Sequence, residues 1–137
     1  MFVQEEQKLI GLVAKESGVP IKTIRYYEEL GLLKASARTE GGFRLFNSDV
    51  LARLNFIKRA QSLGLSLSEI KEFLQIHDRG ELPCEDIKIK LQEKLADIDR
   101  QIQQLLLFKQ ELEGLLSGWE TIPKNPEYTI CPILEKT

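Results

Sequence analysis

The sequence lacks any apolar run long enough to cross a membrane. Its densest apolar patch, Leu-Leu-Leu-Phe at 105–108, is flanked by glutamine and lysine, whereas a membrane helix needs about 20 consecutive apolar residues. The first residues, MFVQEEQK, also lack the basic start and apolar core of a secretory signal. The content of 42% hydrophobic and 29% charged residues is typical of a soluble folded protein. We therefore expect a cytoplasmic location and no membrane partner.

Histidine and cysteine are scarce as well. The chain has one histidine, His77, and two cysteines, Cys84 and Cys131, which are 47 positions apart. Two cysteines in a reducing compartment argue against a disulfide framework. The sequence also contains no glycine-rich phosphate loop and no nucleophile motif, and its lone histidine has no obvious acid–base partner. These absences make an enzyme the least supported class of function.

The charge of the chain is small overall but unevenly distributed. The net charge is −2, which by itself does not indicate a polyanionic partner. Residues 20–60 hold eight basic and four acidic residues, whereas residues 77–137 hold eight basic and twelve acidic residues. The front part is therefore basic and the back part acidic. This asymmetry is expected when only one part of a small protein touches nucleic acid.

Two short helices near the N-terminus match helix-turn-helix geometry. The apolar spacing predicts helices over residues 10–17 and about 20–30, with Gly18 in the turn between them. Ala14 is small enough for the helices to approach closely, and Val13, Val19 and Ile24 fall where they must bury apolar groups against each other.

The second predicted helix has an apolar face and a polar face. Ile21, Ile24 and Tyr27 fall on the face that we expect to pack inward, with the Tyr27 hydroxyl at its rim. Cations on the other face can neutralise phosphates or pair with guanine, and threonine and tyrosine can contact thymine, phosphate or sugar. The alternative is an amphipathic surface helix with tyrosine as core filler. The residues predicted to contact DNA are Lys22, Thr23, Arg25, Tyr26 and, at the rim, Tyr27.

The segment KASARTEGGFRLF that follows is predicted to form a wing. Gly41 and Gly42 can make a tight turn between two short strands. Arginines on both sides of this turn can straddle a DNA backbone or reach a minor groove. Phe43 either packs the wing onto the third helix or contacts a sugar. The predicted contact residues of the wing are Arg38, Gly42, Phe43 and Arg44.

Two further helices complete the predicted N-terminal domain. The Asn-Ser-Asp sequence at 47–49 can cap a third helix, and Ser66 and Glu69 have the spacing of a capping box that starts a fourth. The apolar face of the third helix is predicted to contain Val50, Leu51, Leu54, Ile57 and Ala60.

We divide the chain into a DNA-binding domain (1–76), a linker (77–83), a dimerisation helix (84–116) and a C-terminal effector tail (117–137).

The fifth predicted helix, over 84–116, is too long to bury its apolar stripe against a small domain. At 1.5 Å per residue it is roughly 50 Å long. Its apolar residues recur at seven-residue intervals, which is the signature of a coiled coil; the alternative is packing within its own chain. The predicted dimer-interface residues are Ile87, Leu91, Leu95, Ile98, Ile102, Leu105, Phe108, Leu112 and Leu115.

Residues 9–76 resemble the DNA-binding domain of the MerR family of transcriptional regulators. The combination of TIRYYEELGLL, RTEGGFRLF and LARLNFIKRAQSLGLSLSEI carries the resemblance, and the long helix fits the family's general plan. The resemblance implies a mainly α fold, with a winged helix-turn-helix domain and a homodimer formed through an antiparallel coiled coil. It also implies that the protein binds a palindromic operator and distorts the promoter, acting on RNA polymerase through the DNA. The implied backbone-binding cations of the third helix are Arg53 and Lys58 or Arg59.

The cysteines resemble those of the metal-responsive branch of this family. Cys84 begins the dimer helix and Cys131 lies in the tail, but the branch's thiol at the far end of the helix has no counterpart here. Two thiolates suit a soft ion such as Hg(II) or Cu(I), whereas tetrahedral Zn(II) needs more ligands, of which His77 is one candidate. The alternatives are a thiol-based redox or electrophile sensor and cysteines that only fill space. A coiled-coil module that binds an acidic protein is the rival from another functional class.

Overall fold

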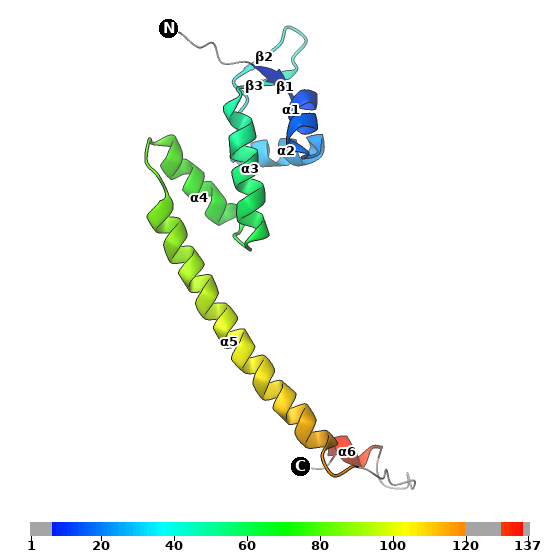
Figure 1. The fold of residues 1–137 in the computed structure, drawn as a ribbon. Coiled ribbons are helices and arrows are strands. Elements are labelled where there is room, and N and C mark those ends of the chain that lie inside the picture. The colour runs from blue at the N-terminus through cyan, green and yellow to red at the C-terminus, as the bar shows by residue number, and fades with distance from the viewer. Residues whose placement is uncertain (1–6, 120–129, 136–137) are drawn as a thin grey trace. The chain divides into compact units, whose positions relative to one another are not determined.

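The computed structural model describes residues 7–119 and 130–135, and it divides into two units, residues 1–86 and 87–137. The first unit contains β1 (Lys8–Leu9), α1 (Ile10–Ser17), α2 (Ile21–Glu29), β2 (Ala37–Arg38), β3 (Arg44–Phe46), α3 (Asp49–Ser62) and α4 (Leu67–Asp78). Helix α5 (Cys84–Leu116) begins at the end of the first unit, and α6 (Pro132–Glu135) lies in the second (Figure 1). The mainly α fold predicted from the sequence is confirmed.

Helices α1 and α2 form the predicted helix-turn-helix. Gly18 ends α1 in a left-handed conformation, with φ of 73°, and its N–H donates to the Ala14 carbonyl at 2.9 Å. A side chain is strained in this conformation, so glycine suits the position. Val13, Val19 and Ile24 are all buried, as the sequence predicted.

The wing is part of a three-stranded antiparallel sheet in the order β1-β3-β2. Strands β2 and β3 pair through Ala37 with Leu45 and through Arg38 with Arg44, as expected for the hairpin around the Gly41–Gly42 turn. The pairing of β1 with the other edge of β3, Lys8 opposite Phe46, was not predicted. A two-residue strand has too little alternation to be recognised in a sequence.

The core of the first unit is formed by α1 to α4 and the sheet. Ile57 and Ile70 are fully buried, together with Phe46, Phe73, Leu32 and Leu54. Both halves of the predicted capping box are present: the Glu69 N–H donates to Ser66 Oγ, and the Ser66 N–H donates to Glu69 Oε1. Two details differ from the predictions. The Ser48 side chain makes no cap hydrogen bond at the start of α3, and Leu51 is half-buried rather than part of the core.

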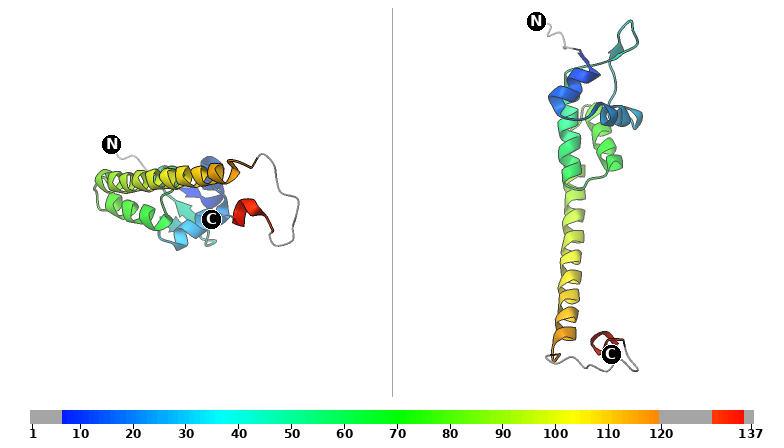
Figure 2. Two further views of the ribbon diagram at one scale, coloured as in Figure 1. Left: turned by 90° about the horizontal axis from the view of Figure 1, so that it is seen from below. Right: turned by 90° about the vertical axis from the view of Figure 1, so that its right-hand side faces the viewer.

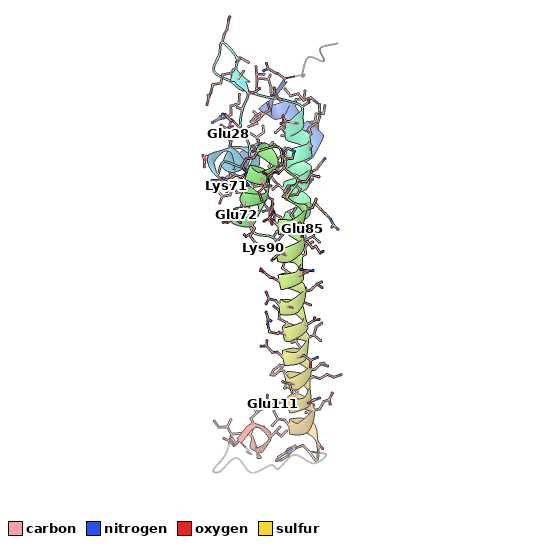
Figure 3. All side chains as sticks on the ribbon, turned by 90° about the vertical axis from the view of Figure 1, so that its left-hand side faces the viewer. Glu28, Lys71, Glu72, Glu85, Lys90 and Glu111 are labelled. Atoms are coloured by element: carbon pink, nitrogen blue, oxygen red, sulfur yellow. The ribbon has the colours of Figure 1, made fainter. Side chains whose placement is uncertain are left out.

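Helix α5 has the predicted bounds and contains 33 residues, none of them buried. Figure 2 shows one uninterrupted helix, and Figure 3 shows its side chains projecting on all sides. The short helix α6 was not predicted, because four residues are too few to show a helical period. Among the described residues, no helix combines the length and the apolar content needed to span a membrane.

Candidate nucleic-acid interface

The exposed face of α2 carries the polar residues that the sequence assigned to it. Lys22, Arg25 and Tyr26 are exposed and Thr23 is half-buried. A hollow on the surface is lined by Ile21, Lys22, Arg25, Tyr26 and Glu29. Two cations, a phenol and a hydroxyl on one open helix face are suited to phosphates and base edges.

The inward face of α2 is narrower than predicted. Ile24 is fully buried and Tyr27 is 6% exposed, but Ile21 is 38% exposed and belongs to the edge of the open face. The Tyr27 hydroxyl donates to Gln61 Oε1 of α3 at 2.8 Å, and burial raises the pKa of this tyrosine. Tyr27 therefore anchors α2 to α3, and its hydroxyl stays protonated and able to donate at neutral pH.

The wing is tied to α2 by an ion pair. Arg44 Nε donates to Glu28 Oε1 at 2.8 Å, and both side chains are half-buried. The other oxygen of this carboxylate, Oε2, is buried and has no hydrogen-bond partner within the described residues. Arg44 thus fixes the base of the wing. Glu28 was not singled out in the sequence, because its partner lies 16 residues away and no local pattern links the two.

The tip of the wing is open. Gly42 has φ of 83°, its N–H donates to the Thr39 carbonyl at 2.9 Å, and Arg38 Nη1 donates to the Gly42 carbonyl at 3.1 Å. Phe43 is 66% exposed, so it does not pack the wing onto α3. The packing interpretation of Phe43 is therefore wrong, and contact with a sugar stays a prediction.

The three cations predicted on α3 have different surroundings. Arg53 donates to the Leu32 carbonyl and to the Asp78 carboxylate, and Lys58 Nζ donates to the Ser17 carbonyl. The Arg59 side chain is exposed and has no hydrogen-bond or ion-pair partner among residues 7–119 and 130–135. Of the three, only Arg59 has a side chain that makes no hydrogen bond within the described residues, so its whole guanidinium is open to a phosphate.

The thiols predicted to bind a metal lie in separate units. Cys84 is exposed at the first position of α5, and Cys131 is half-buried just before α6. His77 is exposed, with its Nδ1 3.5 Å from the Asp78 carboxylate. In the described part of the chain, no three histidine, cysteine, aspartate or glutamate side chains gather as a metal site. Most of the predicted effector tail, residues 120–129 and 136–137, lies outside the described residues.

The apolar stripe of α5 has no cover within the described chain. Nine of its large apolar side chains from Leu95 onward are between 45% and 70% exposed. The predicted interface residues Ile87, Leu91 and Leu115 are half-buried, and Leu95, Ile98, Ile102, Leu105, Phe108 and Leu112 are exposed. A helix with this much exposed apolar surface is expected to bind a partner.

Two family descriptions match the chain. "MerR HTH family regulatory protein" matches residues 9–76, and "MerR, DNA binding" matches residues 51–115. Together they cover the helix-turn-helix, the wing and nearly all of α5.

Known proteins are similar over nearly the whole chain. The Mercuric resistance operon regulatory protein of Bacillus cereus is 41% identical over 126 residues, which cover 92% of this chain and 93% of that protein. The crystal structure of the transcription regulator PbrR691 from Ralstonia metallidurans CH34 in complex with lead(II) gives a TM-score of 0.70 at 33% identity, covering 91% of this chain and 95% of that one. HiNmlR, a MerR family regulator lacking the sensor domain and crystallised bound to promoter DNA, gives 0.54 at 26% identity, covering 82% and 89%. These relatives are regulators, in agreement with the sequence-based argument against an enzyme.

Proposed function

This chain belongs to the MerR family of DNA-binding transcriptional regulators, and from this premise we propose that it acts as a homodimer that binds a palindromic operator, distorts the promoter and responds to a thiophilic metal ion. The observation that carries the proposal is the open face of α2, which presents Lys22, Arg25 and Tyr26 within the basic part of the chain.

Each group on the proposed interface has a distinct role. Arg25 forks onto a guanine edge, Lys22 neutralises a phosphate, and Thr23 meets a thymine methyl or a phosphate. Tyr26 offers its phenol to a phosphate and its ring to a sugar. On the wing, Arg38 and Phe43 reach the backbone and sugars, and Gly42 allows the close turn. On α3, Arg59 contacts a phosphate.

The proposed dimer forms through α5. Its stripe of exposed leucines, isoleucines and Phe108 has the seven-residue repeat of a coiled coil, and a second copy covers it without requiring any other partner. We propose an antiparallel arrangement, as the family resemblance implies. The α2 helix of each protomer, which we call the recognition helix, then binds one of two half-sites related by two-fold symmetry. The spacing of these half-sites follows the helical repeat of DNA. RNA polymerase is affected through the distorted DNA.

Salt dependence of duplex binding tests the proposal against a coiled-coil module that binds an acidic protein. The operator is first selected with the full-length protein from a pool of random duplexes. Its affinity is then measured by fluorescence anisotropy between 50 and 200 mM salt, and we expect a loss on the order of a thousandfold for six or more phosphate contacts. Enrichment of no duplex, or of duplexes without two-fold symmetry, contradicts the proposal.

The thiols fit a soft ion of low coordination number. Cys84 and Cys131 are the only cysteines in the sequence, and two thiolates satisfy linear Hg(II) or Cu(I), whereas Zn(II) needs further donors such as His77 or water. We propose that one protomer's Cys84 and its partner's Cys131 bind the effector. A thiol-based redox sensor is the second candidate, because Cys84 is exposed and therefore open to oxidants.

Replacing the first of these thiols tests the metal site. Cys84→Ser is expected to remove the response of the protein–operator complex to Hg(II), Cu(I) or Zn(II), because a thiolate ligand is lost, while operator affinity is unchanged. The measurements are metal stoichiometry per dimer and operator distortion, followed with a fluorescent base analogue at the operator centre. His77→Ala is the matched control and keeps its response to Hg(II). A full response of Cys84→Ser to all three ions removes Cys84 from the site, and a response to an oxidant without metal favours the redox alternative.

A further inference from the structure

The entry to the recognition helix α2 is held by a cation of α3. Lys58 Nζ donates to the carbonyl oxygen of Ser17, the last residue of α1, at 3.1 Å. The Ser17 hydroxyl in turn accepts a hydrogen bond from the Val19 N–H at 3.1 Å. An ammonium at the C-terminal end of a helix complements the helix dipole and satisfies one of its free carbonyls. Lys58 therefore fixes the turn through which the chain enters α2.

The segment that follows α2 is held by a second cation of α3, Arg53. Arg53 Nε and Nη2 donate to the Leu32 carbonyl at 3.2 and 2.9 Å. Leu32 is fully buried, and its N–H donates to the Tyr27 carbonyl at 2.9 Å, which closes the last turn of α2. A buried carbonyl needs a hydrogen-bond donor. For the Leu32 carbonyl, the two side-chain donors among the described residues are both N–H groups of Arg53.

Arg53 also links this segment to the end of α4. Its Nη1 lies 2.6 Å from Asp78 Oδ1 and its Nη2 lies 3.3 Å from Oδ2, and the arginine side chain is only 16% exposed. The hydrogen bond from Arg53 is the main reason that the pKa of Asp78 is lowered, so the carboxylate is ionised at neutral pH. Leu32 and Asp78 together accept four hydrogen bonds from a guanidinium that has five N–H groups, so one N–H, on Nη1 beside the Asp78 carboxylate, is left for any other partner.

We propose that Arg53 and Lys58 are positioning residues, which set the direction of α2 by holding the chain just before and just after it and do not contact DNA phosphates. The inference rests on the proposed DNA-binding function and changes the role implied for these two cations by the family resemblance. Arg59, on the same helix, keeps the phosphate role. The hydrogen bond from the Tyr27 hydroxyl to Gln61 links α2 itself to α3.

Charge-conserving and charge-removing variants distinguish positioning from phosphate contact. A residue that contacts a phosphate contributes about 0.9 to the slope of log affinity against log salt, whatever the DNA sequence. A positioning residue contributes to specific affinity and leaves that slope unchanged. We compare Arg53→Lys and Arg53→Gln with Arg59→Lys and Arg59→Gln in the full-length protein, on the selected operator and on a scrambled duplex.

Both Arg53 variants are expected to lose on the order of tenfold in operator affinity, because neither lysine nor glutamine reproduces the fork that reaches Leu32 and Asp78 together. Their affinity for the scrambled duplex and their salt slopes stay at wild-type values. Arg59→Gln loses affinity for both duplexes and about 0.9 of slope, and Arg59→Lys behaves as wild type. For the other end of α2, Lys58→Arg keeps a donor and retains operator affinity, whereas Lys58→Met loses it without a change of slope.

Urea unfolding and circular dichroism show which variants fold. If Arg53→Gln does not fold, Arg53→Lys alone decides between positioning and phosphate contact. Wild-type operator affinity in Arg53→Lys, or a reduced slope in Arg53→Gln or Lys58→Met, overturns the proposal and assigns a phosphate contact. If the wild-type protein itself enriches no duplex, the proposed function fails instead, so the two failures are distinguishable.

Discussion

Ile102→Asp in the middle of α5 is expected to abolish dimerisation and, with it, operator binding. Ile102 lies on the apolar stripe and is 47% exposed in the single chain. In a coiled coil it would be covered by the partner, and an unpaired carboxylate there costs about 3 kcal/mol or more. A symmetric dimer contains the change twice, at a total cost of about 6 kcal/mol, so the dimer dissociation constant rises by about ten-thousandfold or more. Sedimentation velocity at micromolar concentration measures the loss.

The matched control places the same carboxylate on the opposite side of the helix. Gln104 is two residues further along α5, about 200° around the helix axis, and is exposed. Gln104→Asp is expected to remain dimeric and to bind the operator with wild-type affinity. A dimeric Ile102→Asp protein would show that α5 does not carry the dimer. Circular dichroism is expected to give the same helical content for both variants, which excludes unfolding as the cause of the lost dimer.

Arg25→Ala is expected to give the largest loss of operator affinity among the DNA-facing substitutions that leave the dimer intact. Arg25 is exposed on α2 beside Lys22 and Tyr26. A bidentate arginine–guanine contact is worth about 1–3 kcal/mol, which corresponds to roughly tenfold to a hundredfold in affinity. Fluorescence anisotropy on operators carrying each base at every position identifies the base pair whose discrimination Arg25→Ala removes.

The control for this substitution removes the same charge far from α2 in the sequence. Arg79 lies after the end of α4 and is exposed. Arg79→Ala is expected to leave operator affinity within about twofold, since surface substitutions away from a functional feature have small effects. Unchanged operator affinity in Arg25→Ala contradicts the groove-facing assignment of α2. A loss that is uniform over all operator sequences assigns Arg25 to a phosphate.

Much of the fold could be predicted because its signals are local. The start and end of α1 and α5, the capping box of Ser66 and Glu69, and the turn at Gly41 and Gly42 all depend on residues within four positions of one another. A helix period, a cap and a tight turn act at that range. The open face of α2 could also be predicted. Successive residues of an α-helix are rotated by about 100° around its axis, so Arg25 falls on another side of the helix than Ile24 and Tyr27.

The roles of individual cations were less predictable. Arg38, Arg44, Arg53, Lys58 and Arg59 all fall in the basic part of the sequence, and composition gives them one common role. In the folded chain Arg44 pairs with Glu28, Arg53 with Leu32 and Asp78, and Lys58 with Ser17, across separations of 16 to 41 residues. Which carbonyl or carboxylate faces each cation depends on how the helices pack.

By itself, the sequence determined the helix-turn-helix, the wing, the long apolar-striped helix and the basic charge of the DNA-facing part, because each follows from the spacing of residues along the chain. Only the tertiary structure decided that β1 joins the sheet, that Ile21 stays at the surface, and that Arg53 and Lys58 bind the chain after and before α2 while Arg59 remains exposed. The physical reason is that hydrogen bonds between distant elements form only after apolar packing has brought their backbones together.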